Sequence, residues 1–66
     1  MQALKSTYQQ RKEARELEIY NRYRSLNMDP SNARMAVLDL IREEFDIASY
    51  PTIYRIVARV EARING

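Results

Sequence analysis

Two short clusters of helix-breaking residues limit what this chain can fold into. One cluster surrounds Pro30 and the other precedes Pro51, and helix-forming residues dominate elsewhere. Strand-like alternation of apolar and polar residues is absent. The two clusters divide the 66 residues into three segments of helical length, so we expect an all-α fold of one domain.

The first segment ends near Leu26, and its second half is clearly periodic. Ile19, Tyr23 and Leu26 recur at i, i+4 and i+7, with Tyr20 beside them, which is the pattern of one buried helix face. Few apolar residues precede this face. We therefore expect the helix to begin between residues 3 and 12.

The second segment has a start signal at Asp29. A carboxylate accepts hydrogen bonds from the free N–H groups of a first helical turn, and Pro30 suits the first helical position. The sequence therefore predicts a helix over about residues 30–45 with Asp29 as its cap. The expected buried face comprises Ala33, Val37, Leu40, Ile41 and Phe45.

The third segment carries two separate stripes of side chains. Ser49 is the expected N-cap, Pro51 falls in the first turn, and the helix should end near Ile64. The apolar stripe comprises Ile53, Ile56, Val57, Val60 and Ile64. The opposite stripe, with spacings of three and four residues, comprises Thr52, Arg55, Arg59 and Arg63.

Charge is segregated along the chain, although the net charge is only +2. Residues 1–27 hold six basic and three acidic side chains, and residues 49–66 hold three and one. Residues 28–48 hold two basic and five acidic side chains. This order suggests one surface that faces a polyanion. The alternative is that the charges only keep a small helical protein in solution.

The composition argues against an enzyme. The chain has no His and no Cys, which removes the usual nucleophile–base pairs and the commonest transition-metal ligands. Its one glycine is the last residue, so no glycine-rich loop holds a phosphate. A domain this small has little concave volume for a small-molecule substrate. We expect no catalytic residues, no metal and no cofactor.

The sequence also predicts a cytoplasmic protein. No apolar run approaches the roughly 18 residues that a membrane span needs. The N-terminus does not lead into the apolar core of a signal peptide, and the absence of cysteine fits a reducing compartment. We therefore expect no contact with a membrane.

Three helices with a short turn between the last two predict a helix-turn-helix domain. In such a domain the last helix lies in the major groove of DNA. Residues 16–66 would form this domain, and residues 1–15 a basic N-terminal helical extension or arm. The stripe from Thr52 to Arg63 would supply donors to base edges and cations to phosphates.

Residues 45–57, Phe-Asp-Ile-Ala-Ser-Tyr-Pro-Thr-Ile-Tyr-Arg-Ile-Val, resemble the pattern F-G-[VI]-S-x-x-T-[ILV]-Y-R-[IL]-[IL]. That pattern is typical of helix-turn-helix domains of the homeodomain-like group, which includes the C-terminal domains of Hin-type invertases and resolvases, many transposases and small phage-type regulators. The resemblance covers roughly residues 16–62. It implies that Ser49 caps the recognition helix, that Thr52 contacts a phosphate or a base, and that Arg55 reads bases.

The chain departs from this pattern at two places. Phe45 and Thr52 lie seven positions apart where the pattern has six, and Asp46 or Ala48 replaces its glycine. Pro51 occupies a position that is often a polar contact to DNA. A longer turn can rotate the third helix against the second, which changes the docking angle.

The favoured hypothesis is that the protein recognises a sequence in double-stranded DNA, as a transcriptional regulator or a module of a mobile-element or phage system. Residues 50–63 would enter the major groove. Tyr50 and Arg55 would read bases. The expected phosphate contacts are Thr52, Arg59 and Arg63. Tyr54 is either a further phosphate contact or a residue at the edge of the core.

The basic residues of the arm have two interpretations. Arg11, Lys12 and Arg15 could contact the DNA backbone or the minor groove. Glutamates alternate with them, however, as on an ordinary exposed helix.

The small size of the domain also leads us to expect protein partners besides DNA. One recognition helix makes few contacts, which favours a homodimer through the first helix or assembly into a larger protein complex. The alternative function is a protein-interaction adaptor, in which the arginine stripe meets an acidic protein surface and no nucleic acid binds.

Overall fold

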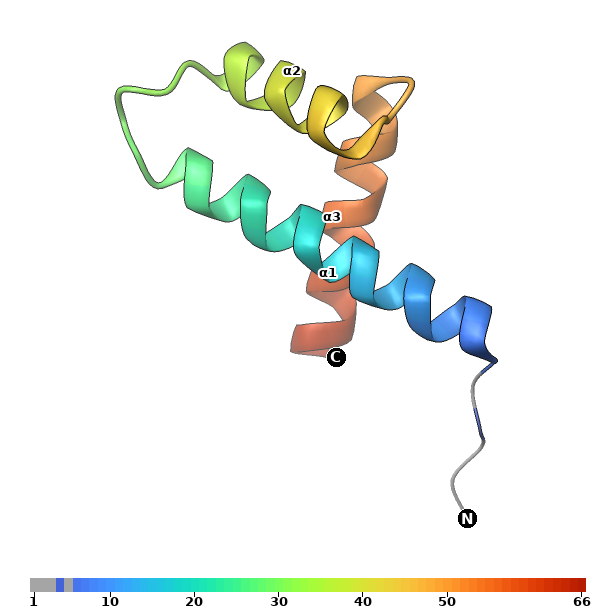
Figure 1. Ribbon diagram of the computed structural model, residues 1–66. Helices are drawn as coiled ribbons and strands as arrows, with labels where there is room; N and C mark the ends of the chain where they lie inside the picture. The colour runs from blue at the N-terminus through green and yellow to red at the C-terminus, as the bar shows by residue number, and fades with distance from the viewer. Residues whose placement is uncertain (1–3, 5) are drawn as a thin grey trace.

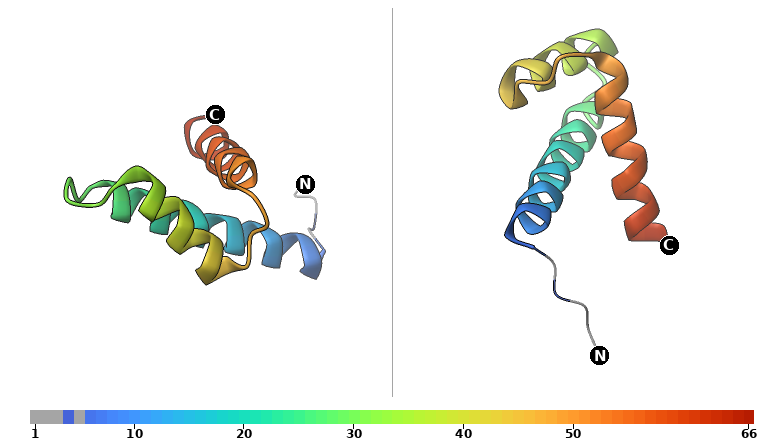
Figure 2. Two further views of the ribbon diagram at one scale, coloured as in Figure 1. Left: turned by 90° about the horizontal axis from the view of Figure 1, so that it is seen from above. Right: turned by 90° about the vertical axis from the view of Figure 1, so that its right-hand side faces the viewer.

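The computed structural model describes residue 4 and residues 6–66, and its described residues form three helices and no strand, which confirms the predicted all-α class. Helix α1 spans Thr7–Asn27, α2 spans Arg34–Phe45 and α3 spans Tyr50–Asn65 (Figure 1). Helices α1 and α2 run in opposite directions, and α3 crosses them from one side (Figure 2). Each helix packs against both others.

Helix α1 begins within the predicted range. Its N-cap is Ser6, whose hydroxyl accepts a hydrogen bond of 3.1 Å from the backbone N–H of Gln9. Residues 7–15 of the predicted arm are the first turns of this same helix, whose N-terminal end extends past α3 in Figure 1. Residues 1–3 and 5 of the predicted arm lie outside the described residues.

The predicted start of α2 at Asp29 and Pro30 is wrong. The helix begins at Arg34, and its N-cap is Ala33, which makes no side-chain capping bond. The Asp29 carboxylate instead accepts hydrogen bonds from the backbone N–H of Ser31 at 2.9 Å and from its hydroxyl at 2.7 Å. These bonds lower the pKa of Asp29 below its ordinary value.

Asn32 holds the same turn against the end of α1. Its side-chain amide donates to the carbonyl of Leu26 at 2.9 Å, and its backbone N–H donates to the carbonyl of Asp29 at 3.1 Å. Residues 29–32 therefore form a turn, because their short polar side chains satisfy nearby backbone groups and compete with helix formation.

The turn between α2 and α3 depends on the backbone of Asp46. This residue adopts the left-handed conformation with φ of 53°, so Asp46 stands where the helix-turn-helix pattern has glycine. The backbone N–H of Ile47 donates to the carbonyl of Arg42 at 3.0 Å and closes the helix end. Ile47 then enters the core, where it is buried.

The start of α3 agrees with the sequence. Ser49 is the N-cap, with an extended backbone, and Pro51 lies in the first turn. The Ser49 hydroxyl lies 2.9 Å from the hydroxyl of Thr52 and makes no capping bond to a backbone N–H. The helix ends at Asn65, one residue beyond the predicted end.

The core lies where the three helices meet. Its buried residues are Ile19, Tyr20, Val37, Leu38, Ile41, Ile47, Ile53, Val57 and Val60. Around them pack the partly buried Tyr23, Leu26, Phe45, Tyr50 and Ile56. The predicted apolar faces of α1 and α3 therefore supply most of the core, as expected.

Three residues predicted to be buried are exposed. Ala33 lies outside α2, Leu40 is 37% exposed, and Ile64 is 60% exposed. Leu38 is buried where Leu40 was expected, because α2 packs against two helices and its buried face turns toward both. Ile64 lies in the last turn of α3, which extends beyond α1 (Figure 1).

No helix in the described part of the chain has both the length and the apolar character that a membrane span requires.

Candidate nucleic-acid interface

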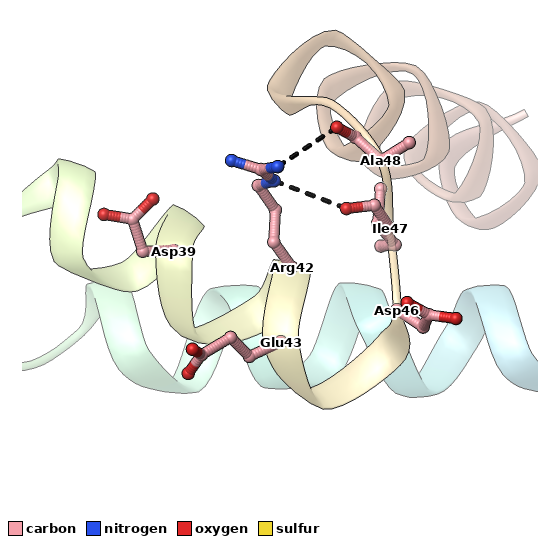
Figure 3. A pocket seen from close by; sticks show the side chains of 6 residues that line it. All are labelled: Asp39, Arg42, Glu43, Asp46, Ile47 and Ala48. Carbon is pink, nitrogen blue, oxygen red and sulfur yellow. Dashed lines mark hydrogen bonds between the residues drawn. The ribbon is translucent and has the colours of Figure 1, made fainter.

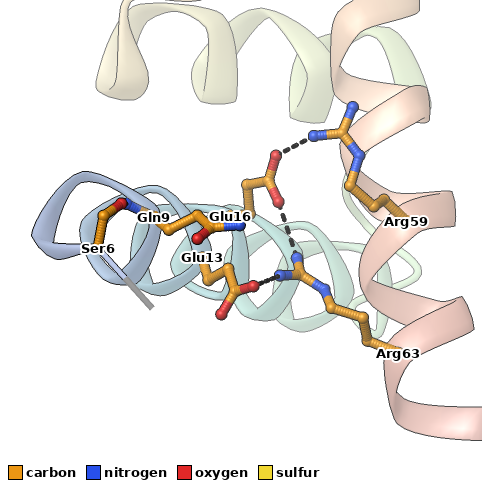
Figure 4. A network of polar contacts seen from close by, with 6 residues as sticks. All are labelled: Ser6, Gln9, Glu13, Glu16, Arg59 and Arg63. Atoms are coloured by element: carbon orange, nitrogen blue, oxygen red, sulfur yellow. Dashed lines mark hydrogen bonds and ion pairs between the residues drawn. The ribbon is translucent and has the colours of Figure 1, made fainter. Parts of the chain in front are cut away.

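The predicted arginine stripe exists on α3, but part of it faces α1 rather than solvent. Arg59 and Arg63 both bind the carboxylate of Glu16 on α1 (Figure 4). The distance from the Arg63 guanidinium to this carboxylate is 2.8 Å, and the same guanidinium lies 3.6 Å from the carboxylate of Glu13. The positive charge of these two arginines is therefore largely compensated within the protein.

Glu16 is a residue of this surface that the sequence patterns did not indicate. It is only 5% exposed, although it belongs to the charged first half of α1. It precedes Ile19 by three positions and Tyr20 by four, so it extends the buried face of α1 by one turn. That spacing is the feature of the sequence from which the burial of Glu16 could have been predicted. A buried carboxylate requires cationic or hydrogen-bonding partners, which two arginines of α3 provide.

Tyr50, a predicted base reader, is turned toward α2. Its hydroxyl donates to the carboxylate of Asp39, and the Arg42 guanidinium lies 4.8 Å from the centre of its ring. Arg42 also donates to the carbonyls of Ile47 at 3.3 Å and Ala48 at 3.1 Å (Figure 3). Tyr50 thus helps to fix the turn before α3, and its hydroxyl is already engaged.

Tyr54 lies on the side of α3 toward α2. It is 39% exposed, and the guanidinium of Arg34 lies 5.9 Å from its ring centre. Tyr54 is not among the side chains that pack against the core, and its two interpretations, phosphate contact and core-edge residue, both stay predictions. Its exposed part remains accessible to a partner.

Arg55 is the arginine of the stripe that has no partner among the described residues, and it is exposed. At 100° per residue, Pro51, Ala58 and Ala62 lie beside it on the face of α3 opposite the core. All three are exposed. We call these four residues the outer face of α3.

A hollow of about 360 Å³ lies between the first half of α1 and the first half of α3, and we call it the basic hollow. Its polar lining includes Tyr8, Lys12, Arg15, Thr52, Arg55 and Arg59. Glu16 also lines it and is already bound by arginine. The structure thus brings two of the three predicted backbone contacts on α1 beside three residues of the α3 stripe. Arg11 is exposed but does not line this hollow.

A second hollow, of about 460 Å³, lies between the first half of α1 and the last turns of α3. Its apolar lining comprises Ala14, Leu17, Val60 and Ile64, of which Leu17 and Ile64 are exposed. A homodimer through α1 stays a prediction.

No protein-family model matches the chain, and no curated protein or solved structure matches it either. The likeness of residues 45–57 to the helix-turn-helix pattern thus rests on those residues themselves. Within residue 4 and residues 6–66, no three His, Cys, Asp or Glu side chains form a group that could hold a metal ion.

Proposed function

We propose that this protein is a helix-turn-helix protein that binds double-stranded DNA with α3 in the major groove. The observation that carries the proposal is Arg55, which is exposed on the outer face of α3 without a partner in the described part of the chain. A guanidinium in this position can donate two parallel hydrogen bonds to O6 and N7 of guanine.

The neighbours of Arg55 favour a close approach to DNA. Pro51, Ala58 and Ala62 have short side chains, so none of them projects beyond the arginine. The major groove is about 12 Å wide and admits one α-helix. In Figure 2, α3 lies to one side of α1 and α2, and the side of its ribbon turned away from them meets no other helix.

The roles of the individual residues differ from those that the sequence predicts. Base reading is assigned to Arg55 alone, because the hydroxyl of Tyr50 is bound to Asp39. Arg59 and Arg63 primarily anchor α3 to α1 through Glu16. Thr52 keeps its predicted role as a phosphate contact, because it lines the basic hollow beside Lys12 and Arg55. We further propose that the protein acts as a small regulator or as a module of a mobile-element or phage system.

Selection of bound duplexes from a random pool, followed by a salt titration of the selected duplex, tests this proposal. We expect a preferred site and a logarithm of the affinity that falls linearly with the logarithm of salt, by about 0.9 for each phosphate contact. If no duplex binds at about 50 mM salt, the proposal is wrong. Binding of an acidic peptide in place of duplexes would support the adaptor function.

A further inference from the structure

We propose that the basic hollow between α1 and α3 binds a backbone phosphate of the duplex whose major groove holds α3. This inference rests on the proposed function and assigns a second contact to the same partner. Arg55 belongs both to the outer face of α3 and to the lining of the hollow. A duplex seated on the outer face therefore reaches the rim of the hollow.

The hollow gathers positive charge from two helices. Lys12 and Arg15 come from α1, and Arg55 and Arg59 come from α3. Lys12 has no partner among the described residues and is exposed. The guanidinium of Arg15 donates to the carbonyl of Phe45, a neutral acceptor that leaves its charge uncompensated. Three of the four cations are therefore available to an anion.

The carboxylate of Glu16 in the lining repels an anion less strongly than an unpaired carboxylate would. Glu16 is buried and hydrogen-bonded by Arg59 and Arg63. The hydroxyls of Tyr8 and Thr52 add neutral donors on the α1 and α3 sides. Charged and neutral donors around one volume suit the oxygens of a phosphodiester.

The position of the hollow favours a DNA backbone over another anion. Two phosphate strands flank any helix that lies in the major groove, so one flank of α3 faces each strand. The flank toward α1 carries Thr52 and Arg59 beside Lys12. At 100° per residue, the flank toward α2 carries Tyr54 and Glu61 instead. Arg24 and Arg34 lie beside Glu61 on this second flank, so two cations there oppose one carboxylate, whereas the α1 flank gathers four cations around one buried carboxylate. The α1 flank therefore has the higher positive charge to meet a phosphate strand.

This arrangement gives the first turns of α1 a role in DNA binding. The first turns of α1 extend past α3 (Figure 1), and Lys12 and Arg15 line the hollow between the two helices. We infer that these turns reach the backbone outside the bases that α3 contacts. Lys12 would therefore add affinity without adding base discrimination.

Lys12→Ala and Arg11→Ala form a matched pair for the test. Both residues are exposed cations on the same turn of α1, but only Lys12 lines the hollow. The affinity for the selected duplex is measured for each variant over a series of salt concentrations. We expect Lys12→Ala to weaken binding about 3- to 10-fold and to reduce the salt slope by about one, with the ranking of sites unchanged. Arg11→Ala should change binding by less than about twofold.

The possible outcomes separate the inference from the proposed function. Equal losses of affinity in both variants would mean that binding depends only on the overall positive charge of the protein. The inference would then be overturned. Unchanged binding by Lys12→Ala, with wild-type binding intact, would overturn the inference and leave the proposed function standing. Failure of the wild-type chain to bind any duplex would overturn the proposed function itself. Circular dichroism melts check that both variants remain folded.

Discussion

The carboxylate of Glu16 on α1 lies 2.8 Å from the guanidinium of Arg63 on α3, across 47 positions of the sequence. Arg59 binds the same carboxylate, so one buried anion joins two turns of α3 to α1 (Figure 4). Because Arg55 lies on the same helix, this contact also helps to orient the face of α3 that carries Arg55. The orientation of the candidate interface therefore depends on a contact that does not itself meet DNA.

We expect Glu16→Gln to lower the free energy of unfolding by about 1–2 kcal/mol, because the amide leaves Arg59 without a counter-charge and Arg63 with Glu13 alone. The loss stays below that of a fully buried pair, since the Arg59 and Arg63 side chains are 49% and 36% exposed. Thermal unfolding should show a midpoint lower by roughly 4–8 °C per kcal/mol. Glu18→Gln, which removes an exposed carboxylate from the same helix, is the control. Equal shifts in the two variants would contradict this role of Glu16.

Arg55→Ala should remove base discrimination at one position of the selected site and weaken binding to it by about 1–3 kcal/mol. The measurement is competition between the selected duplex and single-base variants. Arg59→Ala is the comparison, because it should lower stability through Glu16 and leave the ranking of sites unchanged. A uniform weakening of all sites by Arg55→Ala would make Arg55 a phosphate contact.

Asp46→Gly should stabilise the protein by roughly 0.5–1 kcal/mol, because glycine adopts the left-handed conformation at φ of 53° without steric cost. Asp46→Ala removes the same carboxylate but keeps a Cβ, so it should be the less stable of the two. Urea unfolding of both variants measures the difference. If the alanine variant is as stable as the glycine variant, backbone strain at this position has no role.

Arg42→Lys should destabilise the turn before α3 by about 1 kcal/mol. Lysine keeps the positive charge but loses the planar group that contacts the carbonyls of Ile47 and Ala48 together with the ring of Tyr50. Hydrogen exchange should be faster than in wild type at the backbone amide of Ile47, which donates to the carbonyl of Arg42 in this turn. Unchanged exchange there would show that charge alone is sufficient.

The carboxyl group of Asp29 should titrate below its ordinary pKa of 3.8, because the hydroxyl and the backbone N–H of Ser31 stabilise the ionised form. Its pKa is lower in the folded chain than in the unfolded chain. The stability that it contributes is therefore present above pH 3.8 and is lost as the pH falls through the folded value. Carbon NMR titration measures the pKa of the Asp29 carboxyl group in the folded chain. The Ser31→Ala substitution should raise that pKa toward 3.8. An unchanged pKa in that variant would assign the shift to another cause.

The sequence by itself determined the number of helices, most of their limits and most of the core. These features depend on local periodicity and on residues such as Ser49 and Pro51, whose preferences act within one turn of helix. Where two local preferences competed, the prediction was wrong. Asp29 was expected to cap α2, but its carboxylate binds Ser31 and holds a turn.

Only the tertiary structure decided which arginines of α3 remain available to a partner. Spacing along the helix places Arg55, Arg59 and Arg63 on one side, but it does not reveal that α1 offers a buried carboxylate to two of them. The physical reason is that the charge of an arginine is compensated by groups close in space, and Glu16 lies more than 40 positions away in sequence. The same crossing of α1 and α3 brings Lys12 beside Thr52 and Arg55, a cluster that no local pattern predicts.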